Sequence, residues 1–330
     1  MSKDVQCLLC PHACVMEPGQ RGSCRVRMNL DGELVSLVYG RPVAVHVDPI
    51  EKKPLYHFRP GSLSYSLATA GCNLACRFCQ NWEISQSAPE EVPPYDLPPE
   101  AVVEEAENAG CSSIAYTYTE PIVFYEYMLD TAKLAHERGL RNVMITAGYI
   151  NQGPLRELCE HMDGANVDLK SIRDDYYRQV CYGKLDPVLD ALEVMVEHGV
   201  WVEVTNLVVP TLNDAEEDLR DLSRWILDNL GEDVPLHFSR FFPTYRLTNK
   251  PPTPVSTLRA ARETALEEGL NHVYVGNVVT ASGSHTTCPG CGETMIEREG
   301  YTVVNNRIED GMCPECGTEI KGVWLDEQAQ

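Results

Sequence analysis

The sequence predicts an α/β fold in which parallel β-strands are joined by crossover helices. Along the middle of the chain, six short β-rich runs alternate with amphipathic stretches of helical length, which is the pattern of βα units. The chain has 330 residues, of which 43% are hydrophobic and 23% charged, so it can bury a sizeable core in about two domains. Eleven of its 14 cysteines fall into three tight groups, and two of these groups set the ends of the chain apart. The alternation is compatible with either a barrel or an open sheet.

The individual elements follow from local composition. Prolines lie near the starts of four predicted helices, at positions 99, 121, 154 and 187, where a missing backbone N–H is tolerated. The predicted strands are 66–69, 113–118, 142–146, 165–169, 200–204 and 235–238. The predicted helices are 99–109, 121–138, 153–162, 186–198, 214–230 and 256–268.

Two cysteine-rich segments flank the βα region. The first contains a predicted hairpin with strands at 25–28 and 34–38, because Asp31 and Gly32 form a favourable two-residue turn. The last contains two cysteine knuckles around a β-like segment. The predicted boundaries are 1–60 for the N-terminal lobe, 61–283 for the βα region and 284–330 for the C-terminal module.

Charge and hydropathy exclude several classes of protein. With 27 Lys and Arg against 49 Asp and Glu, the net charge is -22, which argues against non-specific binding of nucleic acid. The chain has neither an apolar run of membrane-spanning length nor the apolar core of a signal peptide, so we expect no membrane association and a cytoplasmic location. In that reducing compartment, metal or redox chemistry is a better expectation for the cysteines than disulfides.

The strongest motif is a compact triple of cysteines, Cys72, Cys76 and Cys79, directly after the first predicted strand. Three thiolates in one loop can bind three irons of a [4Fe–4S] cluster and leave the fourth iron open to a chelating small molecule. The end of a strand in a βα series is also where barrel active sites lie. The alternatives are a zinc knuckle or three incidental core cysteines.

This Cys-x3-Cys-x2-Cys loop, followed by further βα units, resembles the radical S-adenosylmethionine (SAM) enzymes. The resemblance implies a partial (β/α)6 barrel of TIM type and a cluster whose unique iron binds the amino and carboxylate groups of SAM. It further implies that one electron, from a donor of flavodoxin or ferredoxin type, cleaves SAM to methionine and a 5′-deoxyadenosyl radical. That radical abstracts hydrogen from a substrate that the sequence does not identify.

Within that superfamily the chain is similar to the pyruvate formate-lyase activating enzymes. Thr117 to Pro121 stands where the family has Gly-Gly-Glu-Pro, so the resemblance makes Glu120 a partner of the SAM ammonium, although the two glycines are missing. The other cofactor-binding candidates on this basis are Asn81, Asp168, Lys170, Asn206 and His237. Each also has an ordinary structural explanation: a solvated carboxylate, a surface ion pair, or a histidine satisfied within the core.

The last cysteine group predicts a closed metal site. Two Cys-x2-Cys knuckles, separated by 21 residues, have close to zinc-ribbon spacing, and four thiolates leave no position for a substrate. We therefore expect structural zinc, with iron as the alternative. The four ligands are Cys288, Cys291, Cys313 and Cys316.

The first cysteine group also predicts a metal site, with less regular spacing. Its intervals of two, three and nine residues fit an auxiliary iron–sulfur cluster or zinc about equally. The four candidate ligands are Cys7, Cys10, Cys14 and Cys24.

The two ends, together with the segment from His237 to Arg246, resemble the radical SAM member of the AmmeMemoRadiSam system. This resemblance implies Memo-like and AMMECR-like proteins as partners, and it makes Arg240, Tyr245 and Arg246 candidates for substrate contacts. Two other functions stay open. One is activation of a partner enzyme by making a glycyl radical, and the other is a zinc-bound interaction scaffold without catalysis.

Overall fold

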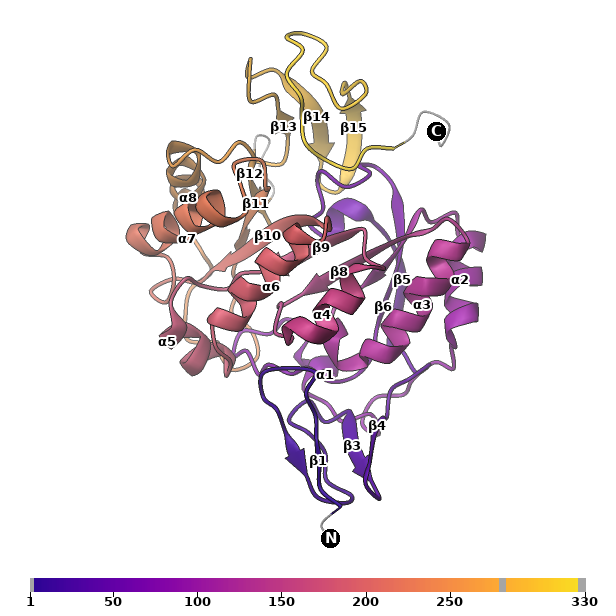
Figure 1. Ribbon diagram of the computed structural model, residues 1–330. Coiled ribbons are helices and arrows are strands. Elements are labelled where there is room, and N and C mark those ends of the chain that lie inside the picture. Colours follow the sequence, from indigo (N-terminus) through magenta and orange to yellow (C-terminus); the bar gives the residue numbers. More distant parts are fainter. Residues whose placement is uncertain (1–2, 279–282, 326–330) are drawn as a thin grey trace.

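A computed structural model describes residues 3–278 and 283–325, and its centre is one eight-stranded sheet (Figure 1). The strand order is β12-β11-β10-β9-β8-β7-β6-β5, in which neighbours from β6 to β12 run parallel and β5 is an antiparallel edge. The parts of the predicted segments that fall at 1–2, 279–282 and 326–330 lie outside the described residues. The strands are β5 (Ala44–Pro49), β6 (Leu63–Ala68), β7 (Ser113–Tyr116), β8 (Arg141–Thr146), β9 (Gly164–Asp168), β10 (Trp201–Val208), β11 (Leu236–Arg240) and β12 (Val273–Gly276).

The helices form the crossovers between parallel strands. Figure 1 shows α3, α4 and α6 in front of the sheet, and α8 packs against β11 and β12. The helices are α1 (Trp82–Ser85), α2 (Pro99–Asn108), α3 (Tyr125–Glu137), α4 (Gln152–Cys159), α5 (Asp174–Tyr176), α6 (Asp186–Glu197), α7 (Glu216–Asn229) and α8 (Val255–Glu267). Short 3-10 turns lie at Ile50–Lys52 and Pro121–Phe124, and a π-helical turn spans Tyr177–Cys181.

All six predicted parallel strands are present, because strands covered on both faces are short apolar runs that the sequence reveals. Every residue of β7 is buried, for example. The six-unit prediction missed two strands. One is β12, a run of only four residues, and the other is the edge strand β5, whose His46 and Asp48 interrupt the apolar pattern.

One part of the segment 1–60 joins the main sheet, since β5 pairs with β6. The remainder forms two small hairpins at one end of the molecule (Figure 1). One pairs β1 (Val5–Gln6) with β2 (Val15–Met16), and the other pairs β3 (Arg27–Leu30) with β4 (Glu33–Ser36). The second is the predicted hairpin, and its turn residues Asp31 and Gly32 have φ of 54° and 102°.

The C-terminal module lies at the opposite end of the molecule (Figure 1). It is a three-stranded antiparallel sheet of β13 (Thr286–Thr287), β14 (Thr294–Glu299) and β15 (Thr302–Asn306). His57 and Arg59 form backbone hydrogen bonds with Val323, which joins the module to the segment between β5 and β6. Among the described residues, no helix is both long and apolar enough to cross a membrane.

Two glycines allow these ends to approach the rest of the molecule closely. A Cβ on Gly71, which precedes the first cysteine of the central loop, would lie 2.6 Å from Val26 Cγ1 and 2.7 Å from the carbonyl oxygen of Cys24. A Cβ on Gly322 would lie 2.7 Å from the carbonyl oxygen of His57. Both positions therefore require glycine for packing.

Candidate active site and metal centres

The central cysteine loop, defined by Cys72, Cys76 and Cys79, follows the carboxyl end of β6. Its three thiols are sheltered from solvent and held by local hydrogen bonds. The backbone N–H of Leu74 donates to Cys72 Sγ at 3.4 Å, and Cys79 Sγ is hydrogen-bonded to Ser85 Oγ at 3.2 Å. Burial, followed by the nearby carboxylate of Glu120, raises the pKa of Cys72 well above its ordinary value. A cation bound at this thiol would favour its thiolate form.

Cys76 differs from its two neighbours because its pKa is lowered. The thiol of Cys181 donates a hydrogen bond to Cys76, and the charge of Lys170 also favours the thiolate. Cys181 ends the π-helical turn, whose backbone carbonyls accept from the N–H groups of Ala75 and Arg77 at 3.1 and 3.0 Å. The turn therefore fixes the central loop through both backbone and side chain.

Lys170 carries the positive charge of the site. Its Nζ lies 2.8 Å from Asp168 Oδ2 at the end of β9. Burial opposes this charge, yet Asp168 and the two thiols of Cys76 and Cys181 hold the pKa of Lys170 well above its usual range. The amide of Asn206 donates to the carbonyl of Leu169 at 2.8 Å, so it supports the backbone that presents Lys170.

Glu120 is buried at the end of the strand next to the loop. Its carboxylate accepts from Thr146 Oγ1 at 2.6 Å, from the N–H of Ala147 at 2.8 Å and from the N–H of Ile122 at 3.3 Å. Burial outweighs these bonds and raises the pKa of Glu120. A carboxylate offers about four acceptor positions, so one remains for a further donor.

Tyr118 occupies a place where the resembled family has glycine. It has φ of 62°, a left-handed conformation that is unfavourable for a residue with a bulky side chain. The side chain is secured by the N-terminal segment: its hydroxyl donates to Asp48, and Lys53 Nζ lies 4.5 Å from the ring centroid. The carbonyl of Tyr118 accepts from Asn81 Nδ2 at 2.6 Å, which links this strand end to the central loop.

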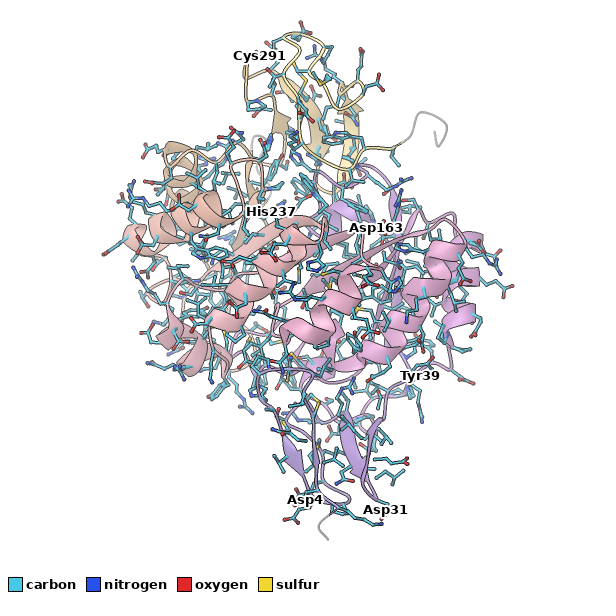
Figure 2. The ribbon with its side chains drawn as sticks, in the orientation of Figure 1. Asp4, Asp31, Tyr39, Asp163, His237 and Cys291 are labelled. Atoms are coloured by element: carbon cyan, nitrogen blue, oxygen red, sulfur yellow. The ribbon has the colours of Figure 1, made fainter. Side chains whose placement is uncertain are left out.

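His237 lies in a separate buried network near the centre of the molecule (Figure 2). Its Nε2 is 2.7 Å from Glu203 Oε2, and its ring stacks on Tyr274 with centroids 5.0 Å apart. Glu203 also accepts the backbone N–H groups of Tyr56 and His57. These contacts fix the orientation of the His237 ring, and its predicted role in cofactor binding stays a prediction.

The segment after β11 packs on the central loop. The ring of Tyr245 stacks on Trp82 with centroids 5.2 Å apart, and the N–H of Arg246 donates to the carbonyl of Arg77 at 2.9 Å. Arg240 is turned back, because its Nε donates to the carbonyl of Thr253 at 2.8 Å. Tyr245 and Arg246 therefore border the loop, whereas Arg240 secures the covering segment.

The C-terminal cysteine site, formed by Cys288, Cys291, Cys313 and Cys316, has the predicted convergent geometry. Its four sulfur atoms all lie within 4.8 Å of one another. The pairs Cys288–Cys316 and Cys291–Cys313 are 3.5 and 3.7 Å apart, close to the separation of about 3.8 Å that a tetrahedral ion with Zn–S bonds of about 2.3 Å requires. Four thiols in this arrangement can hold one metal ion, far out on the module, where Figure 2 labels Cys291.

Comparison with known proteins identifies the central part of the chain. The sequence profile of the Radical SAM superfamily matches residues 66–225, which include the central cysteine loop, Glu120 and Lys170. The chain carries a radical SAM domain. It belongs to the same family as the uncharacterized protein MJ0808 of Methanocaldococcus jannaschii, to which it is 47% identical over 96% of this chain and 95% of that protein.

More distant relatives agree with this assignment. The pyruvate formate-lyase-activating enzyme of Clostridium pasteurianum is 27% identical over 47% of this chain and 66% of that enzyme. A radical SAM methyltransferase from Sphaerobacter thermophilus shares the fold, with a TM-score of 0.53 and 17% identity over 72% of this chain and 71% of that one. The chain is therefore an enzyme with SAM-dependent radical chemistry, which excludes a non-catalytic scaffold. Radical SAM activating enzymes use a reductant, and the comparisons do not name the substrate of this one.

Several residues beside the central cysteine loop could not be predicted from the sequence. Cys181 is about a hundred residues from Cys76, and an isolated cysteine gives the same sequence signal as a buried core thiol. Tyr118 is marked in the sequence only by the absence of a glycine. Asn213, whose Nδ2 donates to the carbonyl of Lys170 at 2.8 Å, has no distinctive local signal.

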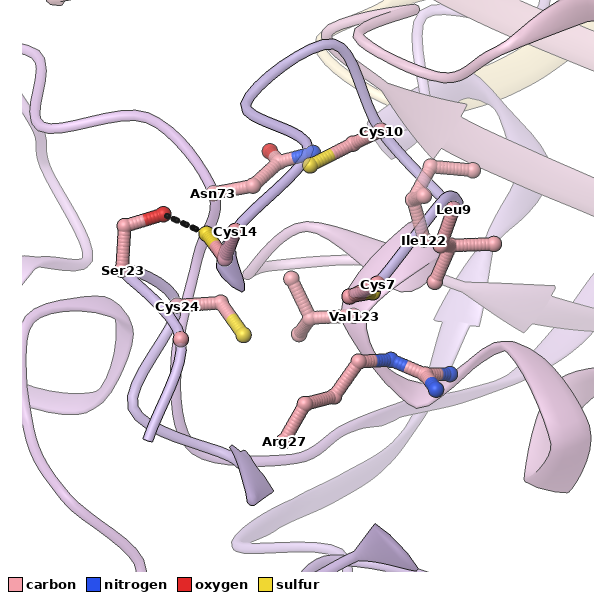
Figure 3. Close-up of a pocket in the computed structure, with 11 residues that line it drawn as sticks. Cys7, Leu9, Cys10, Cys14, Ser23, Cys24, Arg27, Asn73, Ile122 and Val123 are labelled. Atoms are coloured by element: carbon pink, nitrogen blue, oxygen red, sulfur yellow. Dashed lines mark hydrogen bonds between the residues drawn. The ribbon is translucent and has the colours of Figure 1, made fainter. Parts of the chain in front are cut away.

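The N-terminal cysteines line a pocket beside the central cysteine loop (Figure 3). Cys7 and Cys14 close the β1–β2 hairpin, since the N–H of Cys7 donates to the carbonyl of Cys14 at 2.9 Å. Burial raises the pKa of Cys10 to about 11. Other side chains of the pocket are Leu9, Ser23, Arg27, Asn73, Ile122 and Val123.

Proposed function

We propose that the enzyme reductively cleaves SAM at a [4Fe–4S] cluster held by Cys72, Cys76 and Cys79. The cluster, when bound, supplies one electron to the sulfonium of SAM, which yields methionine and a 5′-deoxyadenosyl radical that abstracts hydrogen from the substrate. The observation that carries this proposal is the grouping of three sheltered thiols with Glu120 and Lys170, which follow the carboxyl ends of the parallel strands β6, β7 and β9. This is the edge of the sheet at which α/β enzymes bind their ligands.

The residues of the chain fit such a ligand. Glu120 retains an acceptor position suited to an ammonium group. On β10, Thr205 Oγ1 and Asn206 Oδ1 are buried without a hydrogen-bond partner, and Thr205 pairs in register with Asp168. Buried polar atoms are nearly always satisfied, so Thr205 Oγ1 is suited to a donor group of a bound molecule, whereas the side chain of Asn206, the next residue, lies on the opposite face of the sheet. The stacked rings of Tyr245 and Trp82 lie beside the loop.

The proposal is tested by anaerobic reconstitution of the full chain with iron and sulfide, followed by addition of dithionite and SAM. We expect 5′-deoxyadenosine from the natural sequence and none from Cys76→Ala. Cys159→Ala is the matched control, because it also removes a buried thiol but lies on α4 outside the three cysteine groups. An equal yield from Cys76→Ala would contradict the proposal.

For the C-terminal cysteine site we propose structural zinc, since four thiolates close the coordination sphere. Making a glycyl radical in a protein partner is the second candidate reaction, supported by similarity to the Clostridium pasteurianum activating enzyme. A reducing, cytoplasmic setting and Memo-like or AMMECR-like partners complete the proposal. Incubating the reconstituted enzyme with candidate protein or small-molecule substrates, and recording which of them consumes SAM, distinguishes the two reactions.

A further inference from the structure

We infer that Cys7, Cys10, Cys14 and Cys24 hold a second iron–sulfur cluster, which carries single electrons to the central cysteine loop. The first argument is the distance between thiols. Among residues 3–278 and 283–325, the C-terminal four are the one group of three or more potential ligands whose donor atoms lie within 4.8 Å of one another. The N-terminal thiols are further apart, yet all four line one pocket. A single zinc ion requires convergence, whereas the irons of a cluster are spread over several positions.

The second argument is charge and polarity. Arg27 lines the pocket with only 4% of its surface exposed, and its Nε has no hydrogen-bond partner although its Nη2 pairs with Glu126. Leu9, Ile122 and Val123 supply an apolar wall. A cluster with four thiolates is anionic, so a buried guanidinium and a dry wall are suited to it. Glu126 compensates the charge of Arg27, but the buried Nε–H still lacks an acceptor, which an anionic cluster would supply.

The third argument is contact with the central cysteine loop. Asn73 lines the pocket and directly follows Cys72, so its Cα lies about 3.8 Å from that of a central ligand. Its Nδ2 donates to the carbonyl of Tyr149, its Oδ1 is buried without a partner, and its carbonyl oxygen is 2.7 Å from His12 Nε2. On the other side, Gly71 lets the backbone of Cys24 pack against the residue before Cys72. The two cysteine groups thus share one wall.

The electron-transfer role of this cluster follows from the number of its cysteine ligands. Four cysteines occupy all the protein-ligand positions of a cluster, which leaves no open iron for SAM or substrate. One electron enters from a low-potential donor of ferredoxin or flavodoxin type, and one electron leaves toward the central loop. No bond or proton has to move at the cysteines. This role rests on the proposed function, whereas the presence of the cluster does not.

The presence of the cluster is tested in the full chain with Cys72, Cys76 and Cys79 all changed to alanine. After anaerobic reconstitution we expect about two to four irons per chain with matching acid-labile sulfide, and a paramagnetic signal on reduction that SAM does not alter. Sulfide distinguishes this cluster from iron at the C-terminal site, which contains none. A chain that binds zinc at both ends and no sulfide would overturn the inference.

The electron-transfer role is tested with Cys14→Ser, against Cys111→Ala as a control, because Cys111 is a buried thiol just before β7 that does not line the pocket. We expect Cys14→Ser to lose the SAM-insensitive signal and keep the SAM-sensitive one, while Cys111→Ala keeps both. With a ferredoxin-type donor, deoxyadenosine formation falls about tenfold or more in Cys14→Ser and is unchanged with dithionite. If the rate with the protein donor is unchanged, the electron-transfer role is wrong. If the natural sequence keeps both signals but makes no deoxyadenosine, the proposed function fails while the cluster stands.

Discussion

The two cysteine-rich ends contain four thiols each and differ in how these thiols are arranged. At the C-terminal cysteine site the thiols lie within 4.8 Å of one another, at the tip of a three-stranded sheet. At the N-terminal pocket they surround a space that also contains Arg27 and Asn73. Two regular knuckles bring thiols to one point, whereas intervals of two, three and nine residues distribute them around a wall. The first arrangement suits a structural ion, and the second suits a cluster in contact with the active site.

The largest expected effect comes from breaking the convergent site. Cys291→Ala changes an exposed cysteine, so it removes a ligand without opening a core cavity. Structural zinc provides roughly 10 kcal/mol of apparent binding energy to a small module, and we expect its loss to unfold residues 285–325 locally. Zinc analysis measures the loss of the ion, and limited proteolysis measures the local unfolding. Helix content by circular dichroism checks that the βα region stays folded. Retention of one zinc per chain would show that the site has another ligand.

The junctions of the two ends provide the next comparison. Gly71→Ala puts a methyl group 2.6 Å from Val26 Cγ1 at φ of 94°, and we expect a loss of about 3 kcal/mol from overlap and backbone strain together. The methyl group of Gly322→Ala would overlap with Trp324 and with the carbonyl oxygen of His57. Because φ at Gly322 is not left-handed, we expect a smaller loss of stability than for Gly71→Ala. Gly110→Ala is the control for strain alone, because φ is 66° and nothing lies within 4 Å. Denaturant unfolding measures the free energy of unfolding of the three variants. Equal losses for Gly71→Ala and Gly110→Ala would mean that Val26 and Cys24 move apart to accommodate the added methyl group.

These comparisons show what the sequence could predict. The parallel strands, the central cysteine loop and the C-terminal ligands follow from local pattern, because buried strands and cysteine knuckles are specified by neighbouring residues. The association of Asn73 with the N-terminal cysteines, and of Cys181 with Cys76, arises from contacts between distant segments. A histidine on a strand, such as His237, has the same local signal whatever it contacts, and its pairing with Glu203 is visible only in the tertiary structure.

The C-terminal junction, unlike the N-terminal one, is expected to be weakened by acid. His57 and His272 are buried there with ring centroids 4.3 Å apart, and burial lowers the pKa of His272 from 6.5 to about 4, against the opposing charges of Asp233 and Glu203. Between these values the unfolded state binds a proton that the folded state does not, so stability falls as the pH decreases. From pH 7 to pH 5 the loss at His272 is about 2 kcal/mol. Unfolding measured at both pH values, with His272→Gln as the variant, should show a smaller acid loss in the variant than in the natural sequence.

Charge at the N-terminal pocket gives the smallest effect and the most direct distinction between the ends. If Arg27 compensates an anionic cluster, Arg27→Leu favours the oxidised form and lowers the reduction potential of the SAM-insensitive signal by about 60 mV, a tenfold change for one electron. Arg27→Lys keeps the charge but not the planar guanidinium, and we expect it to recover part of the shift. A redox titration followed by electron paramagnetic resonance measures both. The C-terminal site shows no reduction potential to shift, because zinc does not change oxidation state. A shift confined to the N-terminal signal therefore locates this redox chemistry at the N-terminal pocket, where the thiols are spread apart.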